Sequence, residues 1–462
     1  MFRVGAHLPL AVVAPQPWFP LQRLLRLLKP GYRPGAPRHE TQQGHDVWFP
    51  RFFSLPGAFR QLDGWFMALG AWPRLARLKR EGRLDLIDAH FGYPDGFAAT
   101  LLGRWLGVPV TVTLRGTETR HARDPALAPR LRTALQRASR VFTVSDSLRQ
   151  VALGLGLPAS QLQVVGNGVD LQRFTPMPRD QARRELGLPA QSPVLVSVGG
   201  LVERKGFHRV IELLPALRQR FPGLVYLVVG GPSPEGDMGA QLQRQVAELG
   251  LQDTVRFLGP LPPEALRVPL SAADVFVLAT RNEGWANVFL EAMACGLPVV
   301  TTRVGGNAEV VCRPELGRVV PFGDAPALHL ALEQALQQPW DAAQIRRYAA
   351  ANTWDSRVEV LLQQFRAAGG RPAARPARAG RSAAAGVQAF TRAAPVRRAG
   401  LAQNGLLRWR PWSARFRQPP AACRFLGSCT RPSFPAWSFR CTSWPSATTR
   451  WPCAANWNAA SG

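Results

Sequence analysis

Short apolar runs alternate with amphipathic stretches along most of the chain, and residues 127–138 form the clearest of these stretches. Such alternation predicts parallel β-sheets covered by helices. In the first half the strand-like runs are 9–14, 86–90, 108–114, 140–145 and 162–165. In the second half they are 194–198, 224–229, 255–257, 275–278, 298–302 and 319–321.

Two carboxylates stand eight residues apart after the apolar run 274–280. The pattern places Glu283 on a loop at the carboxyl end of a buried strand. It places Glu291 in the first turn of a helix that stops at Gly296 and Pro298. Ligands of open α/β sheets bind at that edge. A carboxylate in a first helical turn also suits the helix dipole, so spacing alone leaves a purely structural role open.

The segment around these carboxylates resembles the E-x7-E motif of retaining family 4 glycosyltransferases, which have the two-domain GT-B fold. Ala286 stands where many members carry Pro, and the resemblance extends over residues 44–365. It implies that Glu283 lies beside the donor sugar and that Glu291 binds the ribose hydroxyls of the nucleotide. Asn287, inside the same motif, is a further candidate for donor binding.

A second segment predicts a diphosphate site. The apolar run 193–200 ends at Gly199 and Gly200, and Arg204 and Lys205 follow in a loop before a helix. The apolar residues of that helix have helical spacing: Phe207, Val210, Ile211, Leu214, Leu217 and Phe221. Backbone N–H groups at a helix start and cationic side chains both favour an anion. Ordinary solvated loop charges are the alternative interpretation.

The loop resembles the G-R-L-x-x-x-K-G element of the same family, and this implies that Lys205 clamps the leaving diphosphate. The family's Arg position is Gly200 here, so Arg204 is the candidate substitute. In the first half, His90 ends the run 86–90, where a lone histidine is as often structural as catalytic. The resemblance implies that His90 contacts the donor sugar. Arg115, where relatives often have His, is a candidate for binding acceptor or phosphate.

The resemblance implies an α/β chain of GT-B fold, with two Rossmann-like parallel-sheet domains facing a cleft. Residues 1–166 would form the acceptor-side domain and residues 178–350 the nucleotide-sugar domain, joined by a linker over 167–177. Residues 351–365 would form a helix that crosses back to the first domain. Residues 366–462 would remain as a tail.

Composition narrows the function classes. Hydrophobic residues make up 46% of the chain, enough for large cores, yet no apolar run approaches the roughly 18 residues of a membrane span. The 6 cysteines form no C-x-x-C pair, and neither GxSxG, HExxH nor D-x-D occurs. A hydrolase or a metal-dependent transferase is therefore disfavoured, and we expect neither cofactor nor metal. Cys295 and Cys312 are expected to be small buried or half-buried residues in a cytoplasmic, reducing compartment.

The formal net charge of +27 is concentrated in the tail. Residues 366–462 contain 16 Arg and no Lys, Asp or Glu, together with scattered Trp and Cys. We expect this tail to be disordered or to result from translation out of frame. An arginine-rich arm for nucleic acid or membrane is the competing interpretation.

The first residues raise two further expectations. Leucines at helical spacing alternate with basic residues: Leu21, Leu24, Leu25 and Leu28 with Arg23, Arg26 and Lys29. This stripe predicts peripheral contact with an anionic membrane, at the inner face of the cytoplasmic membrane; packing on the first sheet is an equal alternative. The run 9–14 and the proline-rich loop after it resemble the family's second strand and loop. We therefore expect the family's first strand to be missing upstream, and transfer by the chain from Met1 to be weak.

The resemblance therefore implies a retaining, metal-independent glycosyltransferase that moves a sugar from an NDP-sugar to a glycan or lipid-linked acceptor in cell-surface polysaccharide biosynthesis. The NDP-sugar is a substrate, and the leaving phosphate would deprotonate the acceptor. Two alternatives stay open. One is a non-catalytic nucleotide-sugar-binding protein of the same fold. The other, an Arg-rich nucleic-acid-binding protein, lacks a helix-turn-helix, RRM or zinc pattern, so no nucleic-acid partner is expected.

Overall fold

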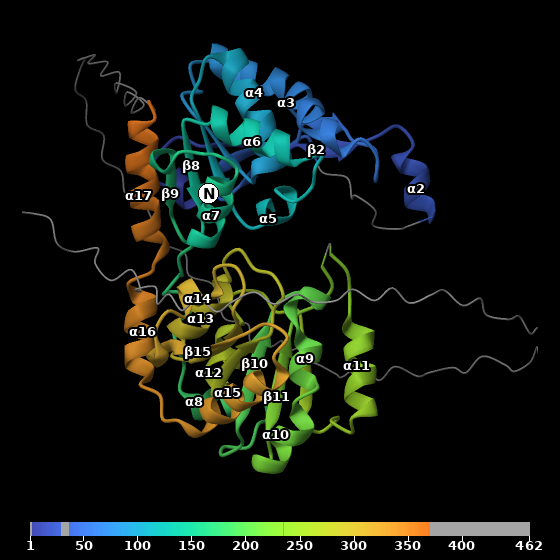
Figure 1. Cartoon of the computed structure of the whole chain (residues 1–462), viewed down its shortest axis with the longest axis vertical. Helices are drawn as coiled ribbons and strands as arrows, with labels where there is room; N and C mark the ends of the chain where they lie inside the picture. The colour runs from blue at the N-terminus through green and yellow to red at the C-terminus, as the bar shows by residue number, and fades with distance from the viewer. Residues whose placement is uncertain (1, 29–36, 234, 370–462) are drawn as a thin grey trace, which may run out of the picture. The chain divides into compact units, whose positions relative to one another are not determined.

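Two parallel sheets organise the part of the chain that the computed structural model describes, residues 2–28, 37–233 and 235–369 (Figure 1). The larger sheet has the strand order β12-β11-β10-β13-β14-β15. Its strands are β10 (Val194–Val198), β11 (Val225–Val229), β12 (Val255–Gly259), β13 (Val275–Leu278), β14 (Val299–Thr302) and β15 (Gly317–Val320). The smaller sheet has the order β6-β7-β8-β9. Its strands are β6 (Ile87–His90), β7 (Val110–Leu114), β8 (Arg140–Thr143) and β9 (Leu162–Val164).

The larger sheet is covered on both faces, which explains its continuous apolar strands. Successive residues of β10 alternate between two buried clusters: Val194 and Val196 belong to one and Leu195 to the other. The helices of the first cluster are α8 (Arg179–Glu185), α12 (Arg267–Ala272), α13 (Asn287–Ala294), α14 (Asn307–Val310) and α16 (Ala342–Ala350). Those of the second are α9 (Phe207–Ile211), α10 (Leu214–Arg220), α11 (Gly239–Glu248) and α15 (Ala325–Gln337).

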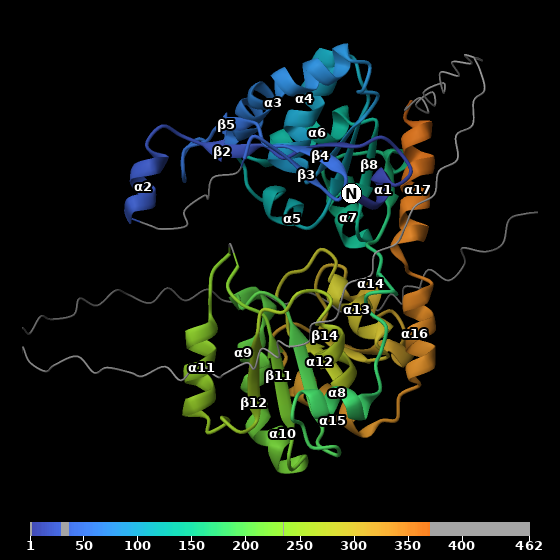
Figure 2. The same ribbon diagram turned by 180° about the vertical axis from the view of Figure 1, so that it is seen from behind.

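The smaller sheet packs with helices from the first half and with the last helix. Its helices are α3 (Asp63–Arg80), α4 (Phe97–Leu106), α5 (Glu118–His121), α6 (Ala128–Arg137) and α7 (Asp146–Gly154). The last helix, α17 (Trp354–Ala367), places the ring of Phe365 6.0 Å from that of Phe142 in β8. Figure 2 shows α1 (Phe2–Gly5) beside α17, where Arg3 pairs with Asp355 at 3.3 Å. The first and last described helices are thus tied together.

Every run that the pattern predicted is a strand, with ends shifted by two residues at most. The first run differs in its partners, because β1 (Ala11–Val13) pairs with β4 (His45–Trp48) rather than with the four-stranded sheet. Four strands were not predicted: β2 (Gln16–Trp18), β3 (His39–Gln42), β4 and β5 (Arg51–Phe53). The β3–β4 hairpin turns at Gln43 and Gly44, both with positive φ. Such turns favour Asn-Gly or Asp-Gly, so Gln43-Gly44 did not indicate a hairpin in the sequence.

The helix expected over 207–221 is two helices, and this prediction was wrong. α9 ends at Ile211 and α10 begins at Leu214, with Pro215 in its first turn. Proline has no N–H to continue a helix, and it disfavours helical backbone at the residue before it. The remaining short helical turns are η1 (Arg60–Leu62), η2 (Gly92–Gly96), η3 (Ala159–Gln161), η4 (Glu203–Lys205) and η5 (Pro314–Leu316).

The structure tests the expectations for the cysteines but not those for the tail. Cys295 is buried and Cys312 half-buried, as expected. The tail from residue 370 onward lies outside the described residues, and so does Lys29 of the leucine stripe. Within the described segments, no helix combines the length and the apolar character that crossing a bilayer requires.

Candidate active site

The site is built at the carboxyl ends of β10 and β13, which are neighbours in the larger sheet. Glu283 lies on the loop after β13, as expected, and Lys205 ends the turn η4 after β10. Backbone bonds join the two loops, because Arg281 N–H donates to the carbonyl of Arg204 at 2.7 Å. The Thr280 hydroxyl donates to the same carbonyl at 2.8 Å. Parallel strands end at one edge, so residues 78 positions apart meet there.

Two cations hold the Glu283 carboxylate. Lys205 Nζ lies 2.7 Å from Glu283 Oε2, and both side chains are only 13% exposed. Arg204 Nη1 lies 3.3 Å from the same oxygen. Arg204 thus stands beside Lys205, where the sequence offered it as the substitute for the family's arginine. Its role in binding diphosphate stays a prediction.

Arg204 has a second acidic partner. Its Nε and Nη2 lie 2.6 and 2.8 Å from the two oxygens of Glu235, a bidentate pair. The hydrogen bonds to Glu235 and the charges of Glu235 and Glu283 raise the pKa of Arg204, although burial opposes this. The same hydrogen bonds lower the pKa of Glu235. Bidentate guanidinium geometry suits phosphate as well as carboxylate.

The glycines of the β10 loop leave room for close backbone approach. A Cβ on Gly230 would lie 1.8 Å from the carbonyl oxygen of Gly199, so the ends of β10 and β11 require glycine at residue 230. Gly199 has φ +159° and faces the side chain of Lys205. A Cβ on Gly200 would lie 3.1 Å from the Cβ of Ser233. The backbone after β10 therefore carries no side chain at Gly199, beside Lys205, or at Gly200.

Glu291 does not lie where the pattern placed it. Because α13 begins at Asn287, Glu291 falls in its second turn, and the expected first-turn position was wrong. Burial raises the pKa of Glu291 to about 7, and the charge of Arg173 lowers it in part. Asn287, the first residue of α13, is exposed. Glu291 is therefore a half-buried carboxyl group whose charge changes near neutral pH.

The first half brings His90 and Arg115 together at the ends of β6 and β7. Arg115 Nε–H donates to His90 Nδ1 at 2.8 Å, and His90 Nε2 lies 3.1 Å from Asp88 Oδ2. With Nδ1 accepting, the ring proton of a neutral imidazole sits on Nε2 and points to Asp88. Burial lowers the pKa of Arg115. The pattern found both residues but not their contact.

Sequence reasoning gave no role to Glu118, which the structure places at the centre of these loops. Its side chain is fully buried, and Oε1 accepts from Gly92 N–H at 2.9 Å. Oε2 accepts from the N–H groups of Arg115 and Gly116 at 3.1 and 2.8 Å. One carboxylate thus ties together the loops after β6 and β7. An acid in the first turn of α5 was the available signal.

Asn167 links the two halves of the chain. Its Oδ1 accepts from Arg115 Nη1 at 3.3 Å, and its Nδ2 donates to Asn287 Oδ1 at 2.8 Å. The backbone is close here as well, since a Cβ on Gly284 would lie 2.2 Å from the carbonyl oxygen of Arg115. Glycine at residue 284, next to Glu283, is therefore required by this approach. The described residues contain no group of three or more His, Cys, Asp or Glu that could hold a metal ion.

Two parallel sheets with helices between their strands, and charged side chains at the carboxyl ends of those strands, define an α/β protein of the GT-B class. Residues 178–352 match the family described as "Glycosyl transferases group 1", and residues 25–173 match "Glycosyltransferase Family 4". The chain belongs to this family of glycosyltransferases. It is therefore an enzyme that transfers a sugar from a nucleotide sugar.

Three comparisons illustrate the similarity. The chain is 34% identical to "D-inositol 3-phosphate glycosyltransferase" of Geodermatophilus obscurus, over 64% of this chain and 70% of that protein. It is 36% identical to "GDP-mannose-dependent alpha-(1-6)-phosphatidylinositol monomannoside mannosyltransferase" of Mycolicibacterium smegmatis, over 50% of this chain and 64% of that protein. Among solved structures, sucrose-phosphate synthase from Thermosynechococcus elongatus is similar with a TM-score of 0.61 and 25% identity. That match covers 72% of this chain and 86% of the other.

Proposed function

We propose that the chain is a retaining glycosyltransferase that moves a sugar from an NDP-sugar to a glycan or lipid-linked acceptor in cell-surface polysaccharide biosynthesis. The cluster of Lys205, Arg204 and Glu283 is the observation that supports this most. Two cations that hold a carboxylate in a half-buried site are equally suited to phosphate oxygens, which carry the same kind of charge. Stabilising the charge of the departing diphosphate is the main catalytic task in such a transfer.

In the proposed reaction the acceptor oxygen bonds to the anomeric carbon while the bond from that carbon to the diphosphate oxygen breaks. The electron pair goes to the diphosphate, whose charge Lys205 and Arg204 neutralise. The proton of the acceptor hydroxyl goes to the leaving phosphate on the same face of the sugar, which gives retention. Because two side-chain cations balance the charge, the proposed reaction uses no metal ion.

The remaining candidates would bind and orient the donor, except Arg115, which is a candidate for the acceptor. Glu291 would accept hydrogen bonds from the ribose hydroxyls, and Asn287 would contact the donor nearby. The bare backbone at Gly199 and Gly200 would lie against the diphosphate. From the first half, His90 would contact the donor sugar. Arg115, held by the His90 ring, would meet the acceptor or its phosphate.

A lipid-linked acceptor is favoured by one relative, whose name describes mannosyl transfer to phosphatidylinositol monomannoside. An acceptor of this kind lies in a bilayer, so the enzyme would work at the cytoplasmic face of the membrane as a peripheral protein.

The test is transfer by the purified chain from UDP-, GDP- and ADP-sugars to candidate acceptors, with release of the nucleoside diphosphate as the readout. We expect release to depend on acceptor, to continue in excess EDTA, and to give a product with the anomeric configuration of the donor. An inverted product would refute retention, and loss of activity in EDTA would refute the metal-independent reaction. Nucleotide binding without any transfer would favour the non-catalytic alternative.

A further inference from the structure

Two leucines of α2 (Gln22–Leu28), Leu24 and Leu27, are exposed, while Leu25 is half-buried. Leu24 is 58% exposed and Leu27 is 79% exposed, whereas the side chain of Gln22 is buried. This contradicts the alternative that the stripe packs on the first sheet, at least for Leu21 and Leu24. The side chain of Leu28 lies outside the described residues. Leucines exposed together on one short helix indicate a surface that binds an apolar partner.

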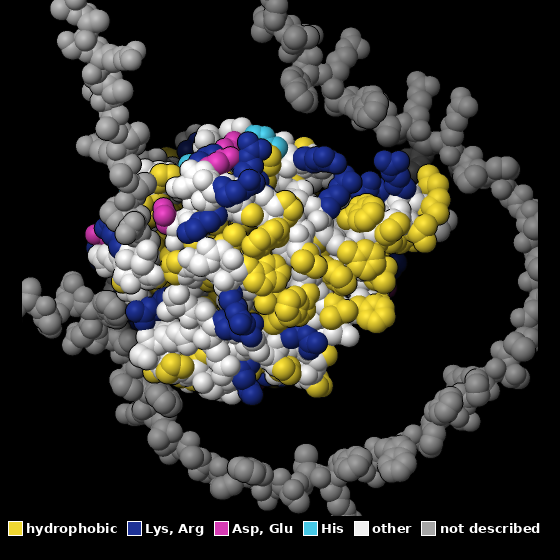
Figure 3. Space-filling view, turned by 90° about the horizontal axis from the view of Figure 1, so that it is seen from above, with side chains coloured by type: hydrophobic (Ala, Val, Ile, Leu, Met, Phe, Trp, Pro, Cys, Tyr) yellow, Lys and Arg dark blue, Asp and Glu magenta, His cyan; other side chains and the backbone are white. Residues whose placement is uncertain are grey.

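A second exposed apolar row runs along α3. Trp65, Leu69 and Trp72 follow one another at positions i, i+4 and i+7, and all three are exposed. Trp105 of α4 joins them, because its ring lies 6.4 Å from that of Trp65 and 5.4 Å from that of Trp72. Seen from the side of α3 and α4, hydrophobic side chains form a broad patch with Lys and Arg gathered beside it (Figure 3). Tryptophan is, with tyrosine, enriched at membrane–water interfaces.

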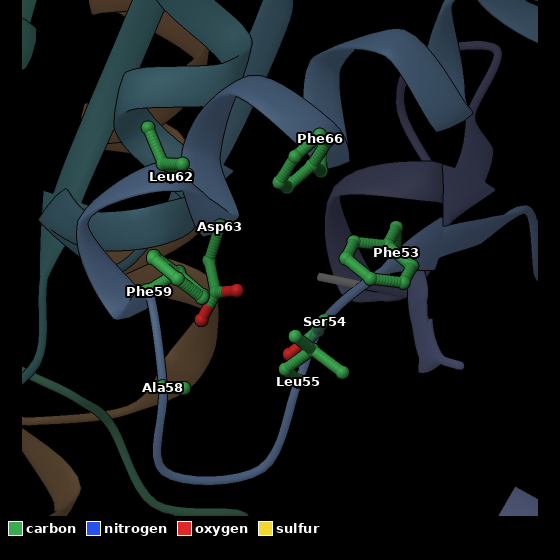
Figure 4. A pocket seen from close by; sticks show the side chains of 8 residues that line it. All are labelled: Phe53, Ser54, Leu55, Ala58, Phe59, Leu62, Asp63 and Phe66. Carbon is green, nitrogen blue, oxygen red and sulfur yellow. The ribbon is translucent and has the colours of Figure 1, made fainter. Parts of the chain in front are cut away.

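A small, mainly apolar pocket of about 200 Å³ lies at the start of α3, where Asp63 and Phe66 line it (Figure 4). It is lined by Phe53, Ser54, Leu55, Ala58, Phe59, Leu62, Asp63 and Phe66. The rings of Phe53 and Phe66 meet edge to face at 5.3 Å, and Phe66 is one turn from Leu69 on α3. Phe53 also lies beside Trp18, its partner across β2 and β5. The pocket, the α3 row and the β2–β5 pair therefore belong to one surface.

Phe59 is held on this surface in a strained conformation. Its φ of 53° lies in the left-handed region, which is unfavourable for a bulky side chain. Its side chain is nevertheless 59% exposed, so burial of the ring does not compensate the strain. Strained residues of this kind cluster at functional sites.

Positive charge is concentrated in the same part of the sequence. Residues 1–80 contain 12 Arg and Lys against 3 Asp and Glu, whereas residues 81–365 contain 29 against 27. Exposed bases near the apolar rows include Arg23 on α2, Arg60 before α3, Lys79 and Arg80 at the end of α3, and Arg104 on α4. An apolar surface bordered by bases matches an apolar partner that carries anionic groups at its boundary.

We infer that this surface docks the protein on a lipid bilayer that contains anionic lipids. The docking surface consists of Trp18, Leu21, Leu24, Leu27, Phe53, Phe59, Trp65, Leu69, Trp72 and Trp105. Its leucines and Phe59 enter the acyl boundary, its tryptophans lie at the headgroup level, and the surrounding bases contact the anionic headgroups. The inference rests on the proposed function only for its setting at a membrane, and it names the surface that reaches the bilayer.

The test is sedimentation of the full chain with vesicles of phosphatidylcholine alone or with about one-third phosphatidylglycerol. A variant with Leu24→Gln and Leu69→Gln removes one leucine from each row. Leu330→Gln is the matched control, because Leu330 is 53% exposed, close to the 59% of Leu69, but lies on α15. The arginine-rich tail is present in every variant, so its contribution to binding is the same in each comparison.

We expect the wild-type chain to bind the anionic vesicles, and the double variant to bind them at least about tenfold more weakly. The control should bind like the wild type, and all three should have the same thermal midpoint. Phe59→Gly should also bind more weakly, with thermal stability equal or higher, because glycine relieves the left-handed backbone. Binding of the double variant equal to wild type, or no binding by the wild type, would overturn the inference.

The same variants distinguish this inference from the proposed transfer. Release of nucleoside diphosphate in the presence of a water-soluble acceptor should be unchanged by Leu24→Gln and Leu69→Gln. Wild-type transfer together with unaltered vesicle binding would remove the docking surface and keep the enzyme. Vesicle binding lost as expected, in a chain that transfers no sugar, would keep the docking surface and remove the proposed reaction.

Discussion

Replacing Glu118 with Gln should destabilise the protein and slow transfer, because one carboxylate holds two loops. An amide must put its NH2 group where Oε1 or Oε2 now stands. The less costly choice is Oε1, which accepts from the Gly92 N–H and, at 3.3 Å, from the Thr117 hydroxyl, a group that can turn to accept from the new NH2. Oε2 accepts from two backbone N–H groups, those of Arg115 and Gly116. The Gly92 N–H then faces another donor in a fully buried place. An unsatisfied buried N–H costs about 1–3 kcal/mol, and the two remaining bonds lose their charged acceptor.

We therefore expect the free energy of unfolding, measured in urea, to fall by about 2–5 kcal/mol. The loops after β6 and β7 carry His90 and Arg115, so kcat should fall at least tenfold, an effect of about 1.4 kcal/mol or more. Affinity for nucleoside diphosphate should change little, since the proposed nucleotide site lies in the second half. Glu315→Gln, the same change at an exposed glutamate, is the control.

Two results would refute this reasoning about Glu118. One is an unfolding free energy and a kcat both equal to those of the wild type. The other is a loss of nucleotide affinity as large as the loss of kcat, which would mean that the substitution disturbs the whole structure and that Glu118 does not specifically position the two loops.

Three further predictions concern charge. Glu291 should need its negative charge to bind ribose, so affinity for nucleoside diphosphate should rise as pH increases through about 7. Calorimetric titration with nucleoside diphosphate at several pH values should show this rise in the wild type and not in the Glu291→Gln variant. Burial raises the pKa of Glu291 above its unfolded value, so its contribution to stability is fully present below the unfolded pKa and is lost as pH rises through about 7; urea unfolding at several pH values should show this loss in the wild type and not in Glu291→Gln. Asp274→Ala should lower the free energy of unfolding by about 3–5 kcal/mol. The side chain of Arg183 is only 1% exposed and pairs with Asp274 at 2.9 Å, so the substitution would leave an unpaired buried charge. The control Asp355→Ala, at an exposed carboxylate, should lower the free energy of unfolding far less.

The strands could be predicted because the second sheet is buried on both faces. Runs such as Val194–Val198 are continuously apolar for that reason, and their ends were correct within two residues. The strands β2 to β5 could not be predicted in the same way. They are short and partly exposed, so they lack the apolar run, and their hairpin turns at Gln43 and Gly44 without the usual asparagine.

Site residues could be predicted from the sequence where they directly follow a strand of a parallel sheet. Glu283, Lys205, His90 and Arg115 all follow strands of parallel sheets, so each lies at a carboxyl edge. Contacts between these loops depend on side-chain geometry that no spacing encodes. The bond from Arg115 to His90 is one example, and the four donors around Glu118 are another.

Turnover of the Lys205→Ala enzyme tests most directly whether the two cations at Glu283 stabilise the leaving diphosphate. Lys79→Ala is the matched control, because it removes an exposed lysine that contacts nothing in the proposed donor site. With a water-soluble acceptor and saturating NDP-sugar, we expect Lys205→Ala to lower kcat by about 2–4 kcal/mol in activation free energy, roughly 30-fold to 1000-fold, with the fold intact. A folded Lys205→Ala enzyme that turns over at the wild-type rate would contradict the assignment of this cluster to the leaving diphosphate.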